Sequence, residues 1–260
     1  MTATLEVKSL SKRFGGIVVT KNVSFSLQAG ARHALIGPNG AGKSTLVGLL
    51  SGVITPNAGT IELMGEDVTR KSPQYRVKRG LVRTFQVNSL FLSLSVLENI
   101  LLATSEHRGA SNRMFGSLAK RNDLIDEAMR VLSSVGLEPH ASQKVGELPY
   151  GQQRLVEIAL ALSLEPKVLL LDEPAAGIPS GDVPYLLGAI EKLPANIAIL
   201  MIEHDMALVR QFAHDVTVLV AGEILLSGKP DSIMSDSEVR RVYLGEGGQS
   251  RYASTQAGHV

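Results

Sequence analysis

Short apolar runs separated by glycine-bearing turns fill the first eighty residues. After one of these runs, a glycine-rich loop leads into STLVGLLSG, an apolar stretch that Gly52 ends and that we interpret as a helix. The other runs have the length and the β-branched residues typical of strands. The predicted strands are LEVKSL, VSFSL, ARHALIG and GTIEL. The pattern therefore predicts a β-rich unit that contains one helix.

The pattern becomes helical between about residues 88 and 165. Apolar residues recur there at helical spacing, and Gly136 is placed to end the helix that they predict. These residues are Leu124, Ile125, Ala128, Met129, Leu132 and Val135. Residues 103–121 show no clear period, so we expect a mobile or partner-facing insertion there.

Strand character returns in KVLLLD and IAILMIEH, continuous apolar runs typical of parallel strands that are covered on both faces. HDVTVLVAGEILLSG then predicts a hairpin that turns near Ala221 and Gly222. Ser235 and Glu238 have the spacing of a capping box for a last helix through Leu244. We expect the small, polar tail, residues 246–260, to be disordered.

These elements predict an α/β core. We expect one domain over residues 1–245, with a helical subdomain, about residues 88–165, inserted between two strands of the core. Apolar residues make up 44% of the chain, enough for a sizeable core. Without cysteine, the chain has no disulfide or thiolate metal site.

The charge balance and the lengths of the apolar runs limit the partners. The 26 Lys and Arg residues nearly match the 25 Asp and Glu residues, so no overall field draws the chain to nucleic acid. The longest apolar runs are far shorter than the ~20 residues of a transmembrane helix. We therefore expect any membrane role to be peripheral.

GPNGAGKST, residues 37–45, has the spacing of a phosphate-binding loop between a strand and a helix. Its glycines let backbone N–H groups turn toward the phosphates of ATP, and Lys43 adds positive charge. The Ser44 hydroxyl is placed to bind Mg²⁺. A glycine turn with an exposed lysine is the structural alternative, and the motif alone does not say which NTPase this is. The candidate ATP-binding residues are Gly37, Pro38, Asn39, Gly40, Ala41, Gly42, Lys43, Ser44 and Thr45.

VLLLDEP, residues 168–174, ends an apolar run in two carboxylates, at the edge where ligands of open α/β sheets bind. Asp172 would hold Mg²⁺ through its water, and Glu173 would polarise the water that attacks the γ-phosphate. An acidic turn is the alternative.

Three other residues are weaker candidates by themselves. His204 at a strand end is more often structural, Gln86 could orient the water or touch Mg²⁺, and Phe14 could stack on adenine or belong to the core.

The order of these motifs resembles the ATP-binding subunit of an ABC transporter over about residues 5 to 245. The resemblance rests on the phosphate loop, the Gln86 segment, the helical insertion, LPYGQQ, LLLDEP and IEHD. It implies a P-loop NTPase core with an N-terminal antiparallel β-subdomain and an inserted helical subdomain. LPYGQQRLVEIALAL, DEPAAGIPSGD, MIEHDMALV and VRRVYLG most resemble the ATPase of branched-chain amino-acid importers. Relatives of those importers handle urea, amides or aromatic acids.

The resemblance implies that two ATPase subunits, either two copies or two paralogues, sandwich two ATP molecules. Tyr150, Gly151 and Gln152 would meet the ATP of the partner subunit, because the free N–H groups at a helix start suit a γ-phosphate. By resemblance, Phe14 stacks on adenine. Gln86 links the γ-phosphate to the membrane subunit, and His204 contacts that phosphate.

The partners of such an ATPase follow from the same resemblance. They are integral membrane permease subunits and, indirectly, an extracytoplasmic substrate-binding protein. The ATPase would lie peripherally on the cytoplasmic face of the plasma membrane, with the permease gripped near Gln86 and in VNSLFLSLSVLENI. No role with nucleic acid is implied.

Two prolines depart from the family pattern. Pro149 stands where the general pattern has a serine that reaches the γ-phosphate, and Pro179 stands where aspartate or asparagine is common. We predict that ATP-driven pairing survives while turnover is slower than in relatives with the serine.

Two other functions compete with transport. A soluble ABC ATPase that acts on ribosomes or DNA typically has two nucleotide-binding domains or a coiled-coil insertion, and a degenerate regulatory subunit would lack Glu173 or His204. The basic segment 70–83 could bind anionic headgroups, but a solvated face beside the nucleotide is favoured.

Overall fold

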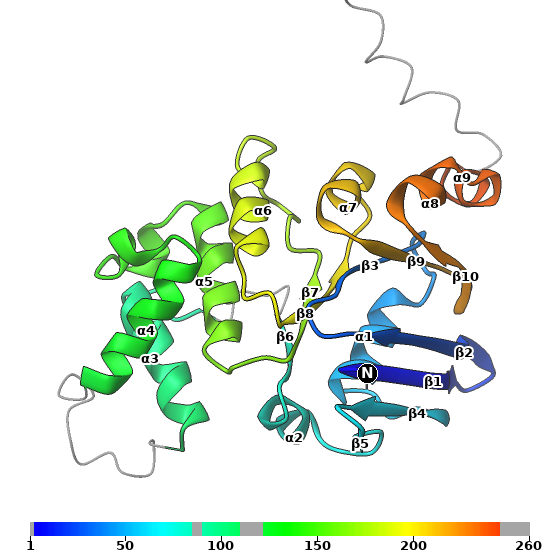
Figure 1. Cartoon of the computed structure of the whole chain (residues 1–260), viewed down its shortest axis with the longest axis horizontal. Helices are drawn as coiled ribbons and strands as arrows, with labels where there is room; N and C mark the ends of the chain where they lie inside the picture. The colour runs from blue at the N-terminus through cyan, green and yellow to red at the C-terminus, as the bar shows by residue number, and fades with distance from the viewer. Residues whose placement is uncertain (1–2, 85–89, 110–121, 245–260) are drawn as a thin grey trace, which may run out of the picture.

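The computed structural model describes residues 3–84, 90–109 and 122–244 (Figure 1). The predictions made for Gln86, for part of the 103–121 insertion and for the tail lie outside these residues.

A small sheet formed by the N-terminal part of the chain has the strand order β2-β1-β4-β5 and is antiparallel throughout. It is the antiparallel β-unit expected from the resemblance. Its first two strands are longer than the sequence pattern predicts, because residues 11–14 and 17–22, outside the predicted runs, also pair with each other. The strands are β1 (Leu5–Phe14), β2 (Ile17–Leu27), β4 (Ala58–Leu63) and β5 (Glu66–Asp67).

The larger sheet has the strand order β10-β9-β3-β8-β7-β6. Only β9 and β10 pair antiparallel; the other neighbours are parallel. The predicted hairpin turn is confirmed, with positive φ values at Ala221 (47°) and Gly222 (83°). The strands are β3 (Arg32–Ile36), β6 (Leu81–Arg83), β7 (Val168–Asp172), β8 (Ala198–Ile202), β9 (Asp215–Val220) and β10 (Glu223–Gly228).

The helices α3, α4 and α5 form a group beside the large sheet (Figure 1). They correspond to the helical segment expected over about residues 88–165. Among the described residues, no helix combines the length and the apolar character needed to cross a membrane. The helices are α1 (Lys43–Ser51), α2 (Pro73–Lys78), α3 (Val96–His107), α4 (Asn122–Ser134), α5 (Tyr150–Leu162), α6 (Val183–Glu191), α7 (Met206–Phe212), α8 (Pro230–Ser235) and α9 (Ser237–Leu244).

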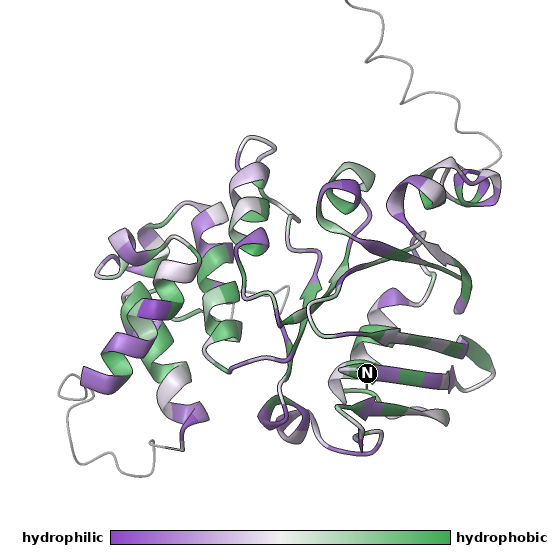
Figure 2. Cartoon of the chain, in the orientation of Figure 1, coloured by the Kyte–Doolittle hydropathy of each residue, from purple (hydrophilic) through white to green (hydrophobic). Residues whose placement is uncertain are grey.

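Both faces of the large sheet are buried. Val168 and Leu170 of β7 join the cluster around α1 and the small sheet, whereas Leu169 and Leu171 join the cluster of the helices on the other face. Successive side chains of a strand point to opposite faces, so a two-sided core requires a continuous apolar run. The apolar colouring of the central strands agrees (Figure 2).

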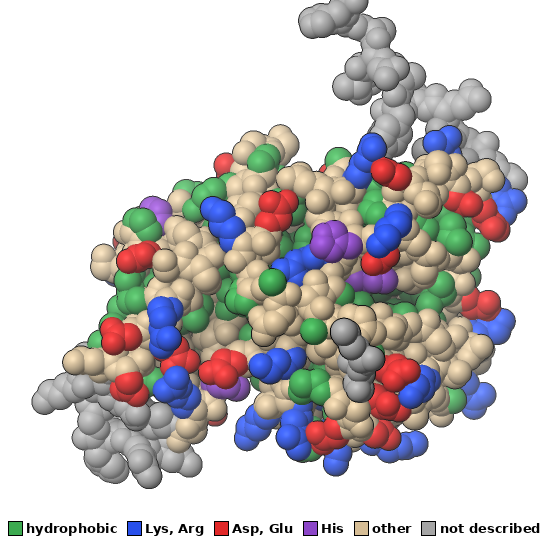
Figure 3. Space-filling view, viewed as in Figure 1, with side chains coloured by type: hydrophobic (Ala, Val, Ile, Leu, Met, Phe, Trp, Pro, Cys, Tyr) green, Lys and Arg blue, Asp and Glu red, His purple; other side chains and the backbone are tan. Residues whose placement is uncertain are grey.

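The basic segment 70–83 forms α2 and β6 and is not a uniformly solvated face. Basic side chains gather around α2 on the surface (Figure 3). Arg76, however, is 1% exposed. Its guanidinium donates to the carbonyl oxygens of Leu49 and Leu50 at 2.7 and 2.6 Å. Because carbonyls at a helix C-terminus lack intrahelical partners, Arg76 completes the end of α1 and holds α2 against it.

The cap predicted for the last helix is wrong. Ser235 is the final residue of α8, and its hydroxyl donates to the carbonyl oxygen of Ser232. Asp236 caps α9 instead, because its Oδ1 accepts the N–H groups of Glu238 and Val239 at 2.9 and 3.0 Å. The sequence pattern did not anticipate that α8 would end so close to α9.

Candidate functional site

The loop between β3 and α1 needs glycine at two positions, because neighbouring strands crowd it. A Cβ on Gly37 would lie 2.1 Å from the carbonyl oxygen of Leu219 in β9, and one on Gly42 would lie 2.6 Å from that of Val19 in β2. Gly42 also has a φ of 99°, which residues with side chains rarely adopt. The predicted phosphate loop is thus fixed between the two sheets.

The β9–β10 turn connects this loop to the small sheet. Gly222 donates its N–H to the carbonyl oxygen of Ala41 at 2.9 Å, and Lys21 donates to the carbonyl oxygen of Gly222 at 2.8 Å. Helix α1 follows Gly42 and has no side-chain cap among the described residues. An uncapped helix N-terminus offers its N–H groups and positive dipole end to an anion.

Lys43 lies within the loop. The side chain is buried, and its Nζ donates to the carbonyl oxygens of Gly37 at 2.5 Å and Pro38 at 3.1 Å. Burial lowers the pKa of Lys43, and the carboxylates of Glu173 and Asp172 act in the opposite direction. The structure therefore brings the predicted lysine and both predicted carboxylates together.

Asp172 and Glu173 stand at the C-terminal end of β7, in different surroundings. Asp172 is 5% exposed, and its Oδ2 accepts a hydrogen bond from Nη2 of Arg83 at 2.6 Å. Glu173 is partly exposed and has a φ of 46°, uncommon for a residue other than glycine. Its N–H donates to the carbonyl oxygen of Ile202 at 3.0 Å, which holds that conformation. Strained backbone of this kind clusters at functional sites.

His204 lies beside Glu173, with its Nδ1 3.9 Å from Oε1 of that carboxylate, and is largely exposed. The preceding residue, Glu203, is buried. Its oxygens accept the N–H groups of Ala175 at 3.4 Å and His204 at 3.2 Å, and burial raises its pKa. Glu203 therefore joins the end of β8 to the loop that follows Glu173.

Arg83 and Glu203 are site residues that the sequence pattern does not single out. Arg83 stands three residues before Gln86 in RTFQVNS, and Glu203 directly precedes His204. The sequence does contain a clue to Glu203, because it is a carboxylate that directly follows an apolar strand. If such a carboxylate is buried, it needs hydrogen-bond partners, so the residue could have been singled out. Arg83 becomes visible only through its long-range ion pair.

Tyr150, Gly151 and Gln152 begin α5. This helix belongs to the helical part and lies apart from α1, which the phosphate loop precedes (Figure 1). Tyr150 is 37% exposed and Gly151 is buried at the start of α5. Pro149 precedes them, and its carbonyl oxygen accepts the N–H of Gln152 at 2.9 Å. The N–H of Gln152 is therefore not free, in contrast to the expectation from sequence.

Phe14 ends β1 and is 48% exposed. Lys12 places its Nζ 5.0 Å from the centroid of the ring. A ring this exposed is not a core aromatic, which favours the stacking hypothesis. Gln86 lies outside the described residues, so its predicted contacts are not part of this geometry.

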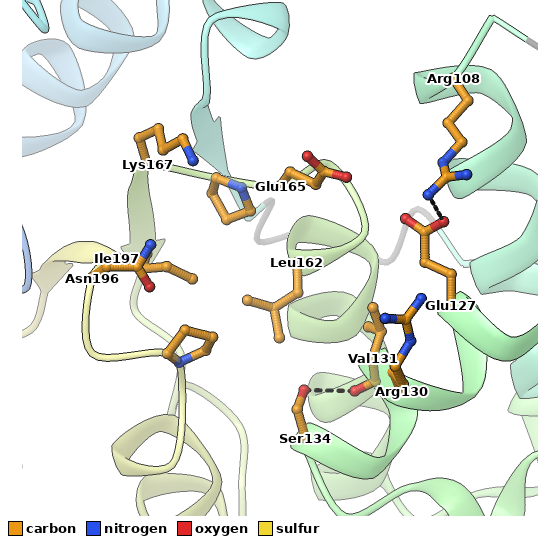
Figure 4. A pocket seen from close by; sticks show the side chains of 12 residues that line it. Arg108, Glu127, Arg130, Val131, Ser134, Leu162, Glu165, Lys167, Asn196 and Ile197 are labelled. Carbon is orange, nitrogen blue, oxygen red and sulfur yellow. Dashed lines mark hydrogen bonds and ion pairs between the residues drawn. The ribbon is translucent and has the colours of Figure 1, made fainter. Parts of the chain in front are cut away.

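Among the cavities lined by described residues, two lie against helices of the helical part. One, of about 470 Å³, lies between α4 and the segments that lead into β7 and β8 (Figure 4). Lys167 in its lining directly precedes β7, whereas Asp172 is the last residue of that strand. The ion pair of Arg108 and Glu127 lines it. The other, of about 830 Å³, is a groove along α3 lined by Leu94, Leu97 and Leu102 among others. The lining overlaps the segment expected to grip a permease at Ser93, Leu94, Ser95, Leu97 and Glu98.

The residues present fit ATP with Mg²⁺. The uncapped start of α1 and Lys43 provide N–H groups and positive charge for phosphates. Ser44 is exposed in the first turn of α1, directly after Lys43, and the carboxylate of Asp172 raises the pKa of that lysine. Hydroxyl and carboxylate oxygens are the ligands that Mg²⁺ prefers, with phosphates and water completing its coordination.

Comparisons with known proteins support this assignment. The family model described as ABC transporter matches residues 20–176. The high-affinity branched-chain amino acid transport ATP-binding protein LivG of Salmonella typhimurium is 38% identical over 251 residues, which cover 93% of this chain and 98% of LivG. BraF of Pseudomonas aeruginosa, which has the same description, is 36% identical with the same coverage.

Solved structures agree with these relatives. A nucleotide-free ATP-binding cassette from an ABC transporter superposes with a TM-score of 0.82 at 31% identity, covering 95% of this chain and all of that one. The ADP conformation of MJ1267, another such cassette, gives 0.83 at 30% identity with the same coverage. The chain therefore belongs to the ABC transporter family, as one of its ATP-binding and ATP-hydrolysing subunits.

Proposed function

We propose that this chain powers an ABC importer for branched-chain amino acids or related small polar or aromatic acids. The observation that carries this proposal is the identity with LivG and BraF along 98% of LivG and nearly all of this chain. The catalytic geometry supports an active ATPase rather than a degenerate regulatory subunit, since Glu173 and His204 lie beside each other. The substrate is the finer part of the proposal, because this subunit would not contact it.

ATP would lie with its phosphates on the loop from Gly37 to Lys43. Glu173 would accept a proton from the attacking water, and His204 would donate a hydrogen bond to the γ-phosphate. Mg²⁺, held by Ser44 and Asp172, would neutralise charge on the phosphates. Phe14 would stack on adenine from the end of β1.

A second ATPase subunit, either a copy of this chain or a paralogue, would complete each site. The separation of α5, which begins with Tyr150, Gly151 and Gln152, from the phosphate loop of its own chain supports this arrangement. Tyr150 and Pro149 are exposed at the start of α5, and Gly151 has the loop around Asp182 against it. This surface would meet the ATP held by the partner, so that ATP closes the pair and hydrolysis opens it.

The groove along α3 would hold a helix of a permease subunit. Phe91 and Leu92 beside it are 59% and 48% exposed, and Leu102 within it is 38% exposed. Apolar side chains grouped at a groove are typical of helix docking. The chain would thus associate peripherally with the cytoplasmic face of the plasma membrane.

Hydrolysis is tested with Glu173→Gln. Loss of the general base should lower the ATPase rate about 100-fold or more while ATP still binds. Wild type and variant should both bind ATP in calorimetry. Equal ATPase rates in the two proteins would contradict the catalytic role of Glu173.

The transport role is tested by co-purification with the membrane subunits that assemble with this chain. Leu102→Asp should abolish co-purification and leave the basal ATPase rate unchanged, because the groove is remote from the phosphate loop. Val53→Asp is the matched control, since Val53 is 65% exposed outside the groove. Co-purification with ribosomes or DNA instead would favour the soluble alternative.

The substrate requires a separate experiment. Once the associated binding protein is identified, screening it against leucine, isoleucine, valine, urea, amides and aromatic acids defines the substrate.

A further inference from the structure

Asp172 pairs with one cation and acts on a second. Arg83 donates to its Oδ2 at 2.6 Å, and the charge of Asp172 raises the pKa of Lys43 against the effect of burial. The side chain of Asp172 is 5% exposed and that of Arg83 is 20% exposed. The attraction between two charges this shielded from water is screened less than that between charges on the surface.

Sheet register explains why residues 89 positions apart meet. Arg83 pairs with Leu170 in the parallel β6–β7 ladder. Side chains two residues apart share a face, so Asp172 projects from the same face as Leu170, which packs in the α1 cluster. Leu81 packs in that cluster too, so Arg83 projects from this face as well. The pair is therefore fixed on the side of the phosphate loop.

We propose that Arg83 is a positioning residue that orients Asp172 and balances its charge, and thereby sets the magnesium dependence of nucleotide binding. The proposal rests on the proposed role of Asp172 as a Mg²⁺ ligand. The hydrogen bond to Oδ2 holds the carboxylate in place. A glutamine at position 83 still carries a donor for it, so Arg83→Gln mainly removes the positive charge. The positive charge of Arg83 offsets the buried carboxylate when ATP enters without Mg²⁺.

Two electrostatic effects of Arg83 act in the same direction. The guanidinium reduces the repulsion between Asp172 and the phosphates, which favours binding of metal-free nucleotide. The guanidinium also repels Mg²⁺, which reduces the gain in nucleotide affinity that the metal provides. Removing the charge should therefore raise the ratio of the dissociation constant in EDTA to that in Mg²⁺.

The experiment measures this ratio by calorimetry with adenylyl imidodiphosphate, an ATP analogue that is not hydrolysed. Turnover is therefore prevented without a substitution at Glu173. Arg83→Gln should raise the ratio about tenfold or more. Arg83→Lys, which keeps the charge, should stay within about threefold of wild type. Arg79→Gln is the matched control, because Arg79 pairs with Glu66 on the exposed side of α2 and should leave the ratio unchanged. An Arg83→Gln ratio equal to that of wild type overturns the proposal.

A double-mutant cycle tests whether Arg83 acts through Asp172. In an Asp172→Asn background, Arg83→Gln should change the ratio by less than about threefold. A tenfold change that persists there overturns the positioning role. This comparison also holds if Arg83→Gln alone fails to fold, because the double variant contains no buried unpaired carboxylate.

The cycle also separates the inference from the proposed function. If Asp172→Asn leaves the magnesium dependence of wild type unchanged, the proposed role of Asp172 as a metal ligand and the inference on Arg83 both fail. If Asp172→Asn changes the ratio and Arg83→Gln does not, only the inference on Arg83 fails.

Discussion

The ring of Tyr150 lies against the backbone of Gly177, four residues after Glu173. A Cβ on Gly177 would lie 3.3 Å from Cε1 of Tyr150 and 3.5 Å from its hydroxyl. The centroid of the ring also lies 5.9 Å from Cζ of the Arg154 guanidinium, which pairs with Glu157 at 2.5 Å. The start of α5 is therefore joined within one chain to the loop that follows the proposed catalytic carboxylate.

Tyr150→Ala should loosen that loop. We expect amide hydrogen exchange in residues 174–182 to accelerate about tenfold, because the ring that supports Gly177 is gone. Tyr150→Phe keeps the ring and should leave exchange unchanged. Equal exchange in the alanine variant and wild type would show that the contact does not hold the loop.

Pro149→Ser should raise the ATPase rate several-fold. Pro149 caps α5 without a side-chain hydrogen bond, whereas serine can accept an N–H of the first turn or reach a γ-phosphate. A serine cap should add about 1 kcal/mol to the free energy of unfolding. Loss of the proline offsets this gain, because it increases the conformational entropy of the unfolded chain. The melting temperature should therefore change little. An unchanged ATPase rate together with unchanged ATP-driven dimerisation would refute this role of Pro149.

Glu203 should make stability depend on pH. Burial raises its pKa above the ordinary value of 4.5, so the folded chain keeps a proton that the unfolded chain has lost. The contribution of Glu203 to the free energy of unfolding is therefore greatest below pH 4.5, and it is lost as the pH rises through the pKa of the folded state. Glu203→Gln removes this dependence. Denaturant unfolding from pH 4.5 to 8 should show wild type losing stability relative to the variant, and parallel pH profiles would contradict the prediction.

Arg76→Met should destabilise the fold by about 2–4 kcal/mol, because it leaves the carbonyls at the end of α1 without donors. Burial lowers the pKa of Arg76 to about 10, so the guanidinium is still charged at neutral pH. Urea unfolding measures the effect. Arg79→Met, at an exposed position on the same helix end, should leave the midpoint of unfolding where it is in wild type. A midpoint for Arg76→Met that matches this control would contradict the role of Arg76.

Local patterns predicted the elements that depend on local geometry. Gly52 ends α1, Ala221 and Gly222 form the hairpin turn, and β7 and β8 are buried on both faces as their continuous apolar runs indicate. For the last helix, the sequence pattern predicted Ser235 as the cap, whereas its neighbour Asp236 caps the helix in the structure. Which of two adjacent residues caps a helix depends on where the preceding helix ends.

The sequence by itself determined the phosphate loop and the two carboxylates, because spacing along a strand and a loop fixes where those groups point. The tertiary structure alone decided the partners of those groups. Arg83 reaches Asp172 through the register of β6 on β7, Tyr150 reaches Gly177 through the placement of α5, and Arg76 reaches α1 through the placement of α2 beside its C-terminal end. Long-range contacts of this kind arise from the packing of whole elements, and a single sequence carries no local period that records them.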